Sequence, residues 1–334
     1  MSEPLRIGVL GAARIAELAI VEPARLTGAR LVAVAARDRS RAEAFAERYG
    51  VERVLDSYQG VVDHPEVEAI YNPLANSLHP VWNLAALRAG KHVLTEKPSA
   101  STALQAREVQ AMATETGLTF MEGFHYCYHP LIGRLHEIVA GGELGDLQHV
   151  ETIMDMPAPA DGDARWQFEL AGGALMDLGC YGLHSHRMLA RFGGGEPRVV
   201  SAKAGERDGH PGVDEWLTAE LAFPSGVTGT AASSMNAESE VMSHRVIGTA
   251  GEALIPDFIH PHEDDRLIVT TVEGTRTEHL GTRSSYTYQL EAFTRAVRTG
   301  RPPVTGADDA VATMSLIDDS YRAAGLPLRP AHGG

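Results

Sequence analysis

The sequence predicts an α/β fold of two domains, in which a doubly wound parallel sheet is followed by an open, mostly antiparallel sheet. A chain of 334 residues has room for two domains of ordinary size. Up to about residue 124, short continuous apolar runs alternate with helical stretches, which is typical of parallel strands buried on both faces. Beyond that point, apolar and polar residues alternate in segments with hairpin-like connections, which favours an antiparallel sheet. We therefore expect domains over residues 1–124 and 125–334.

The first domain is expected to begin with a strand over residues 5–10, a turn at Gly11 and a helix from about Ala13. Further strands are expected at 31–36, 54–55, 69–71, 92–95 and 118–121. Helices are expected at 40–49, 80–89 and 101–115, because a glycine follows each of these stretches. This alternation of strand and helix is the doubly wound pattern that binds dinucleotides.

The second domain is expected to contain a large open sheet and few helices. Strands are expected at 148–154, 199–204, 216–223, 226–233, 244–248, 252–255 and 267–271. The closing helices are expected at 288–299 and 307–324.

Composition excludes several classes of protein. The net charge is −15 and no basic stripe is present, which argues against a nucleic-acid partner. No apolar run approaches the roughly 18–20 residues of a membrane span. The only cysteines are Cys127 and Cys180, which favours a reducing compartment, and no leader-like segment precedes the first strand. We expect a cytoplasmic protein without membrane or nucleic-acid partners.

The turn after the first strand resembles a dinucleotide fingerprint. Gly11, Ala13 and Ala16 occupy the three key positions of G-x-G-x-x-G, which serve the tight turn, the close approach of pyrophosphate and the packing of helix on strand. Alanine adds a methyl group at two of these positions, so an ordinary strand–turn–helix is the alternative interpretation. The residues expected to contact the cofactor here are Gly11, Ala12, Ala13, Arg14 and Ile15.

The end of the second strand indicates which cofactor is preferred. An acidic residue there would bind the ribose 2′-hydroxyl of NAD, whereas an arginine would bind the 2′-phosphate of NADP. Arg37 comes first and follows the small Ala36, whereas Asp38 is expected to cap the next helix. We therefore predict a preference for NADP(H), with NAD(H) as the alternative cofactor. A merely solvated Arg37 is the competing interpretation.

Lys97 stands out because the chain makes little use of lysine. Lysine occurs only at positions 91, 97 and 203, against 26 arginines, yet one of the three lies in the Thr95–Pro98 turn. That turn follows a parallel strand, at the edge where open α/β sheets bind ligands. Burial can move the pKa of a lysine, whereas an arginine keeps its proton. A surface lysine in a strand-end turn is the alternative.

A glycine-rich stretch over residues 172–184 carries three polar side chains at helical spacing. A helix starting near Gly173 would place Asp177, Tyr181 and His184 on one face. The small residues between them would allow close approach by a ligand. A polar helix face turned to solvent is the alternative.

Taken together, these motifs resemble the Gfo/Idh/MocA oxidoreductase family over nearly the whole chain. The resemblance rests on AARD at 35–38, GKHVLTEKP at 90–98, MEGF at 121–124, GGALMDLGCY at 172–181 and YQLEAFTRAVRTGRPP at 288–303. It implies a Rossmann domain followed by an α/β domain with a large open sheet. It also implies a homodimer or homotetramer assembled through that sheet.

The resemblance implies roles for particular residues. Lys97 matches the active-site lysine of the family, and Asp177 matches its aspartate. Tyr181 is similar to the tyrosine of the branch with glucose–fructose oxidoreductase, xylose dehydrogenase and dimeric dihydrodiol dehydrogenase. Residues implied to contact the cofactor near the nicotinamide and its ribose are Asn76, His79, Glu96 and Lys97.

The substrate pocket is implied to differ from that of relatives. Cys127 stands where this branch often has arginine, and His184 and His186 replace commoner apolar residues. Both changes are expected to reshape the pocket. The residues expected to line it are Phe124, Tyr126, Trp166 and His184.

These roles imply an NADP-dependent dehydrogenase or reductase acting on the CH–OH group of a sugar, cyclitol or trans-dihydrodiol. An isolated tyrosine has a pKa near 10, and a neighbouring ammonium lowers it. Tyr181 would therefore exchange the proton, with Lys97 as its electrostatic partner and Asp177 orienting the lysine or a nearby hydroxyl. Neutral Lys97 as the base is the alternative microscopic assignment.

Two other functions and two metal sites remain as alternatives. A redox-cycling lyase or glycosidase would hold NAD and oxidise its substrate transiently, and a nucleotide sensor would bind the cofactor without catalysing a reaction.

The segment 260–265 carries potential metal ligands but is more typical of a solvated turn. On an extended strand, His125, Cys127 and His129 would share one face, which makes zinc conceivable, although a packed pocket wall is the preferred interpretation. We expect no metal.

Overall fold

The computed structural model describes residues 3–331 and divides into two compact units. The first unit contains the chain up to Phe124 together with Tyr286–Ala312, and the second contains His125–Ser285 and Thr313–Pro330. The division expected from the sequence, 1–124 and 125–334, differs in that residues 286–312 belong with the first unit.

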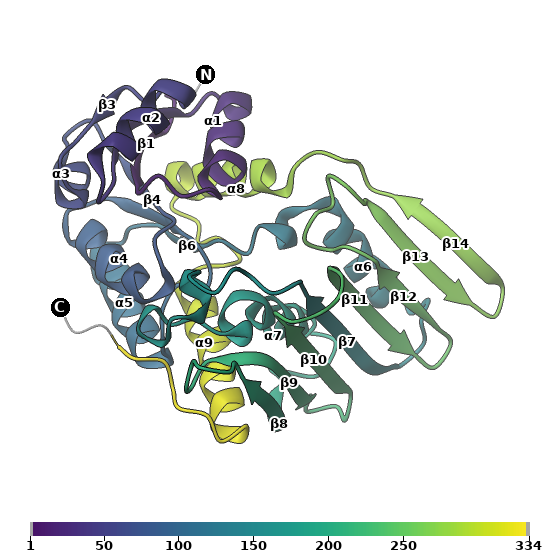
Figure 1. Cartoon of the computed structure of the whole chain (residues 1–334). Coiled ribbons are helices and arrows are strands. Elements are labelled where there is room, and N and C mark those ends of the chain that lie inside the picture. Colours follow the sequence, from purple (N-terminus) through teal and green to yellow (C-terminus); the bar gives the residue numbers. More distant parts are fainter. Residues whose placement is uncertain (1–2, 332–334) are drawn as a thin grey trace. The chain divides into compact units, whose positions relative to one another are not determined.

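The first unit is built on a six-stranded sheet in the order β3-β2-β1-β4-β5-β6, with every paired strand parallel (Figure 1). Its strands are β1 (Arg6–Leu10), β2 (Arg30–Ala35), β3 (Arg53–Val54), β4 (Ala69–Asn72), β5 (His92–Thr95) and β6 (Phe120–Glu122). All residues of β4 and the last five of β2 are buried, so helices cover the sheet on both faces. The expected parallel sheet is therefore confirmed.

Helices alternate with these strands. They are α1 (Glu22–Thr27), α2 (Arg39–Tyr49), α3 (Tyr58–Asp63), α4 (His79–Arg88) and α5 (Ala103–Thr116), with a short 3₁₀ turn over Asn76–Leu78. The helix expected from about Ala13 begins later, because a π turn over Glu17–Val21 precedes α1. Pro23 has no N–H to donate, and wider turns of this kind occur where the regular ladder is interrupted.

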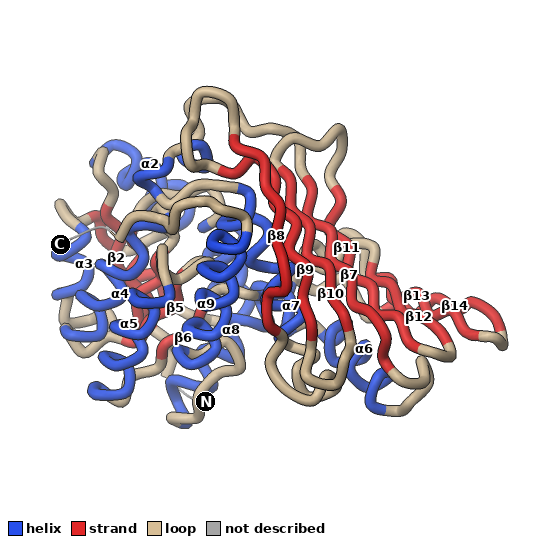
Figure 2. The backbone as a smooth tube through the Cα atoms, turned by 90° about the horizontal axis from the view of Figure 1, so that it is seen from below, coloured by secondary structure: helices blue, strands red, loops and turns tan. Residues whose placement is uncertain are grey.

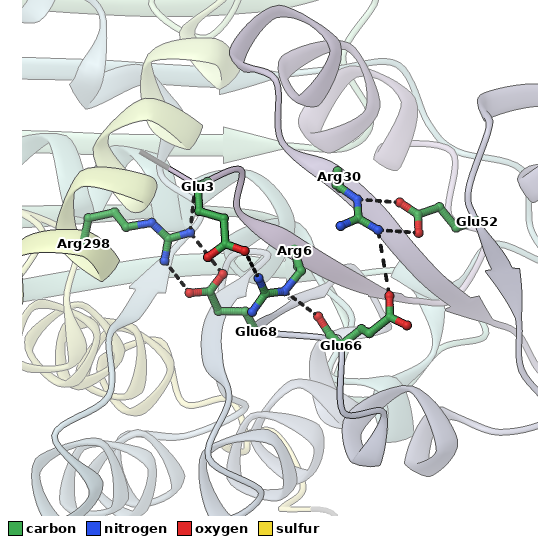
Figure 3. Close-up of polar contacts among 7 residues, drawn as sticks. All are labelled: Glu3, Arg6, Arg30, Glu52, Glu66, Glu68 and Arg298. Carbon is green, nitrogen blue, oxygen red and sulfur yellow. Dashed lines mark hydrogen bonds and ion pairs between the residues drawn. The ribbon is translucent and has the colours of Figure 1, made fainter. Parts of the chain in front are cut away.

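Two C-terminal helices follow, α8 (Ser285–Thr299) and α9 (Ala307–Ala323), and α8 is tied to the first unit by charges (Figure 3). Arg298 of α8 forms an ion pair with Glu68 and donates to the carbonyl oxygen of Glu3 at 3.1 Å. Arg6 of β1 bonds Glu3 and the Glu66 carbonyl, and Arg30 of β2 bonds Glu52. The sequence pattern of α8 indicates that the helix covers a core, but it does not show to which unit that core belongs. The expected division therefore placed residues 286–312 with the second unit.

The second unit is built on an eight-stranded sheet in the order β14-β13-β12-β11-β7-β10-β9-β8 (Figure 2). Its strands are β7 (Leu147–Asp155), β8 (Arg198–Glu206), β9 (Asp214–Ala222), β10 (Thr228–Ser234), β11 (Val241–Gly248), β12 (Gly251–Ile255), β13 (Arg266–Thr271) and β14 (Gly274–His279). Only the β7–β10 pair is parallel, which confirms the mostly antiparallel sheet. Strand β14 was not expected, because its residues are mostly exposed and lack apolar alternation.

Helices cover one face of this sheet. Along β7, every second residue from Val150 to Met154 is buried, as one covered face requires. Helix α7 (Cys180–Arg187) packs on β7 and β10, and α6 (Pro130–Ala140), which was not expected, packs on β13. A π turn over Leu175–Gly179 precedes α7, and 3₁₀ turns cover His125–Tyr128, Ala164–Trp166 and Phe168–Leu170. Among the described residues, no helix has the length and apolarity to cross a membrane.

Candidate active site

The turn after β1 has the shape that a dinucleotide requires. Gly11 adopts a left-handed φ of 89°, and its N–H donates to the Ala35 carbonyl oxygen at 2.7 Å, which joins the ends of β1 and β2. A Cβ at Gly11 would lie 3.0 Å from Leu74 Cδ2, so glycine suits both the backbone and the space. Ala12, Ala13 and Ile15 are half-buried, Arg14 is exposed, and the third motif position, Ala16, is fully buried. These residues fit a nicotinamide dinucleotide.

The residues after β2 differ in their partners. Asp38 caps α2, because its Oδ1 accepts from the backbone N–H of Ser40 at 2.9 Å and from its hydroxyl at 2.7 Å. Arg39 pairs with Glu43, and Arg41 donates to the carbonyl oxygen of Ala12 at 3.0 Å. Arg37 is exposed at the same strand end.

The turn after β5 is held by hydrogen bonds on both sides of Lys97. The Tyr71 hydroxyl donates to Glu96 Oε1 at 2.8 Å, and the N–H of Ser99 donates to Glu122 Oε1 at 2.6 Å. The Lys97–Pro98 peptide bond is cis, and Lys97 itself is half-buried. Burial raises the pKa of Glu96, against the effects of the Lys97 ammonium and the Tyr71 bond. The backbone around Lys97 is thus fixed at the carboxyl edge of the sheet.

His79 lies beneath this turn. Its Nδ1 lies 2.7 Å from the Pro98 carbonyl oxygen, and its Nε2 lies 2.8 Å from that of Leu74, so both ring nitrogens contact backbone. The residue is 1% exposed, and burial lowers its pKa to about 4. His79 therefore links the turn after β4, which contains Leu74 and the half-buried Asn76, to the turn that carries Lys97.

The stripe expected on one helix starting near Gly173 is interrupted. A π turn over Leu175–Gly179, which contains Asp177, precedes α7, which contains Tyr181 and His184. The carboxylate of Asp177 pairs with Arg165 Nε at 2.9 Å. Every residue of α7 is buried, which excludes the interpretation of this stretch as a solvent-facing helix.

Tyr181 and His184 contact a cluster of polar and aromatic side chains. The Tyr181 hydroxyl lies 3.2 Å from His125 Nε2, and the Tyr126 hydroxyl lies 2.6 Å from His184 Nδ1. The Tyr126 ring also contacts the Tyr181 and Phe258 rings edge-on. Sequence reasoning missed His125 as a partner of Tyr181, because an extended strand was weighed for residues 125–129 and the chain forms a 3₁₀ turn over His125–Tyr128.

The other two residues expected near the substrate are also buried. Phe124 is the last residue of the first unit before the chain crosses, and it is fully buried. Trp166 is 1% exposed and donates from Nε1 to the Pro159 carbonyl oxygen at 3.1 Å, while the Arg207 guanidinium lies 4.8 Å from its ring.

The histidines considered as metal ligands have other partners. His129 Nδ1 accepts from the Leu131 N–H and caps α6, and the 3₁₀ turn removes the shared strand face on which a zinc site depended. Near the segment 260–265, Glu240, Asp257 and His260 bring potential ligand atoms within 4.8 Å of one another. Asp257 Oδ1 already accepts from the backbone N–H groups of Ile259 and His260.

Comparison with known protein families agrees with this geometry. Residues 5–124 match a model described as an oxidoreductase family with an NAD-binding Rossmann fold, and residues 132–254 match the Gfo/Idh/MocA C-terminal domain. The chain belongs to the Gfo/Idh/MocA oxidoreductase family. The family, the fold class and the oxidoreductase class predicted from the sequence are thereby confirmed.

Individual relatives cover two thirds of the chain or more. It is 34% identical over 324 residues to D-xylose 1-dehydrogenase (NADP(+)) 2 of Haloferax volcanii, covering 96% of this chain and 97% of that one. A crystal structure of a 3-ketoreductase from Actinomadura kijaniata with NADP and TDP-benzene matches with a TM-score of 0.88, 29% identity and coverage of 96% and 98%. Trans-1,2-dihydrobenzene-1,2-diol dehydrogenase of Bos taurus is 38% identical over 228 residues, which are 68% of this chain and 66% of that one.

Proposed function

We propose that this family member transfers a hydride between NADP(H) and a secondary hydroxyl or carbonyl group of a sugar, cyclitol or trans-dihydrodiol. The observation that carries the proposal is the buried Tyr181, whose hydroxyl is hydrogen-bonded at the start of α7, in a chain that also has Lys97 at the carboxyl end of β5. Relatives named for xylose, dihydrodiols and a keto-sugar reaction favour this range of substrates.

Arg37 supports NADP(H) over NAD(H). Within residues 3–331, neither a hydrogen bond nor an ion pair engages its guanidinium, whereas Arg39 and Arg41 are both engaged. Asp38 is held as a helix cap, so its carboxylate is not poised for a ribose 2′-hydroxyl. An exposed guanidinium beside the small Ala36 suits a 2′-phosphate.

The chain's own groups would manage the proton. Bound nicotinamide supplies the hydride acceptor or donor. In the oxidation direction, Tyr181 takes the proton of the substrate hydroxyl, and the Lys97 ammonium stabilises the phenolate and hydrogen-bonds the substrate oxygen. Asp177, paired with Arg165, orients Lys97 or accepts a bond from a neighbouring substrate hydroxyl.

We also propose a cytoplasmic homodimer or homotetramer assembled through the eight-stranded sheet. Trp216 on β9 is 39% exposed and Val200 on β8 is 54% exposed, so each of these strands carries one large apolar side chain that a partner sheet would cover. Light scattering of wild type and Trp216→Lys tests this proposal, because a charge in the interface should release monomers.

One experiment tests the reaction. Purified protein is incubated with NADP⁺ and a panel of aldoses, inositols and dihydrodiols, and NADPH formation is followed by absorbance. Tyr181→Phe and Lys97→Met should each lower turnover by about 10²–10⁴-fold. Both should still bind NADPH, as measured by fluorescence titration, which separates loss of chemistry from loss of folding.

The panel also separates the competing functions. Near-wild-type turnover in both variants would remove this mechanism. A redox-cycling lyase or glycosidase would convert substrate without releasing NADPH in stoichiometric amount, and a nucleotide sensor would give no turnover with any polyol.

A further inference from the structure

A continuous chain of hydrogen bonds leads from the Tyr181 hydroxyl into the interior of the second unit. Tyr181 Oη lies 3.2 Å from His125 Nε2, and His125 Nδ1 lies 2.8 Å from Ser285 Oγ. His125 and Ser285 are 0% exposed, and Tyr181 is 5% exposed. The three residues come from the 3₁₀ turn at 125–128, from α7 and from the first position of α8.

The chemistry of this chain suits a phenol that gains and loses a proton. A serine hydroxyl both donates and accepts, so Ser285 satisfies either tautomer of neutral His125. With Ser285 donating to Nδ1, the ring proton of neutral His125 lies on Nε2, and when Tyr181 is protonated Nε2–H donates to its oxygen while its own O–H is left for the substrate oxygen. When Tyr181 is ionised, the same Nε2–H donates to the phenolate and Ser285 still donates to Nδ1. The bond to the phenolate is the stronger one, because hydrogen bonds to ionised oxygen exceed those between neutral groups.

We propose that His125 is a positioning residue for Tyr181, and that with Ser285 it holds the phenol oxygen in place and stabilises its ionised form. This inference rests on the proposed function, in which Tyr181 exchanges the substrate proton. No other reactant is needed, because the proton moves only between the substrate oxygen and Tyr181, and His125 keeps its one ring proton on Nε2 throughout.

Other titratable groups lie close to Tyr181 within the second unit. His184, further along α7, contacts the Tyr126 hydroxyl, and the Tyr126 ring lies 5.9 Å from the Tyr181 ring. Asp177, on the preceding π turn, is paired with Arg165. Phe258, which contacts Tyr181, also packs against His244. His125 Nε2 contacts the Tyr181 hydroxyl directly, so His125 is the group to vary.

The direct test is the ionisation of Tyr181 itself. The protein is labelled with tyrosine carrying carbon-13 at the ring ζ position, and Tyr181→Phe identifies the signal of Tyr181 by its disappearance. In His125→Leu, the pKa of Tyr181 should rise by roughly one to two pH units. His125→Gln, which keeps an N–H near the phenol, should retain most of the lowering, and Ser285→Ala should raise the pKa by less than His125→Leu.

The kinetic test uses the same variants. In the oxidation direction, kcat of His125→Leu should fall about 10- to 100-fold at neutral pH and recover as pH rises, because the basic limb moves with the phenol. The KM for NADP⁺ should stay unchanged. A merely structural role would lower the melting temperature of both His125 variants and leave the Tyr181 pKa and the pH profile where they are in wild type.

The two proposals fail in different ways. If Tyr181→Phe retains turnover, the proposed function is wrong, and the NMR titration still reports whether His125 stabilises the phenolate. If Tyr181→Phe abolishes turnover but neither His125→Leu nor Ser285→Ala moves the Tyr181 pKa, the inference about His125 is wrong and the proposed function stands. Should His125→Leu not fold, His125→Gln and Ser285→Ala decide by the same titration.

Discussion

Arg329 and Asp214 form an ion pair with no exposed surface, and this pair ties the C-terminal segment to the turn that precedes Tyr181. Asp214 also accepts from the N–H of Leu175 at 2.6 Å, at the start of the π turn. Arg329 donates to the Gly172 carbonyl oxygen at 2.6 Å. Gly173 has a φ of 126°, and a Cβ there would collide with the Asp214 carboxylate, so the pair and the glycines fit one another closely.

Breaking this pair should destabilise the protein strongly. Arg329→Met leaves the Asp214 charge buried without its cation, and Asp214→Asn leaves the guanidinium without its anion. Each change should lower the free energy of unfolding by about 3–5 kcal/mol, measured by urea denaturation. The double variant should be more stable than the sum of the single losses implies, because no lone buried charge remains. Additive losses would contradict the assignment of this cost to an uncompensated charge.

Acid should destabilise the protein below about pH 6.5. Burial lowers the pKa of His79 to about 4, of His136 to about 4 and of His244 to about 3. Each ring is therefore neutral in the fold but binds a proton in the unfolded chain near its ordinary pKa of about 6.5. Their contribution is fully present above that value and is lost as pH falls toward the folded pKa, by about 1.4 kcal/mol per pH unit for each ring.

The measurement is the urea midpoint as a function of pH. His136→Leu removes one titrating ring from α6, where it packs against Phe192, and should flatten the acid slope by about one proton. An unchanged slope in this variant would show that His136 does not bind its proton on unfolding.

The sequence predicted those features that depend on local pattern. The six parallel strands follow from continuous apolar runs, and the capping by Asp38 follows from its place before a helix. The π turn before α7 was not predicted, because the spacing of apolar residues does not show whether a helical turn contains one additional residue. His125 and Ser285 are 160 positions apart in the chain, so their hydrogen bond has no local signature.

Removal of metals should leave activity unchanged. Among the described residues, potential metal ligands come together at Glu240, Asp257 and His260. The Glu240 carboxylate is exposed, and Asp257 Oδ1 already accepts hydrogen bonds from two backbone N–H groups. Dialysis against a chelator should therefore preserve turnover and melting temperature. Loss of turnover that zinc restores, and that magnesium does not, would overturn this prediction.

Cofactor preference should depend on Arg37 and not on its neighbour Arg39. Arg37→Ala removes an exposed cation at the end of β2 and should weaken binding of NADPH by about 10- to 100-fold, the loss of one or two charge-assisted hydrogen bonds. Binding of NADH should change little, because NADH has no 2′-phosphate for the guanidinium to meet. Arg39→Ala is the matched control. It removes the same charge two residues further along the chain, where the arginine side chain is engaged with Glu43 and Asp56. Fluorescence titrations of both cofactors with the three proteins measure the effect. Equal weakening by the two substitutions would assign the preference to the general field of the arginines, and equal affinity of wild type for NADPH and NADH would remove the preference itself.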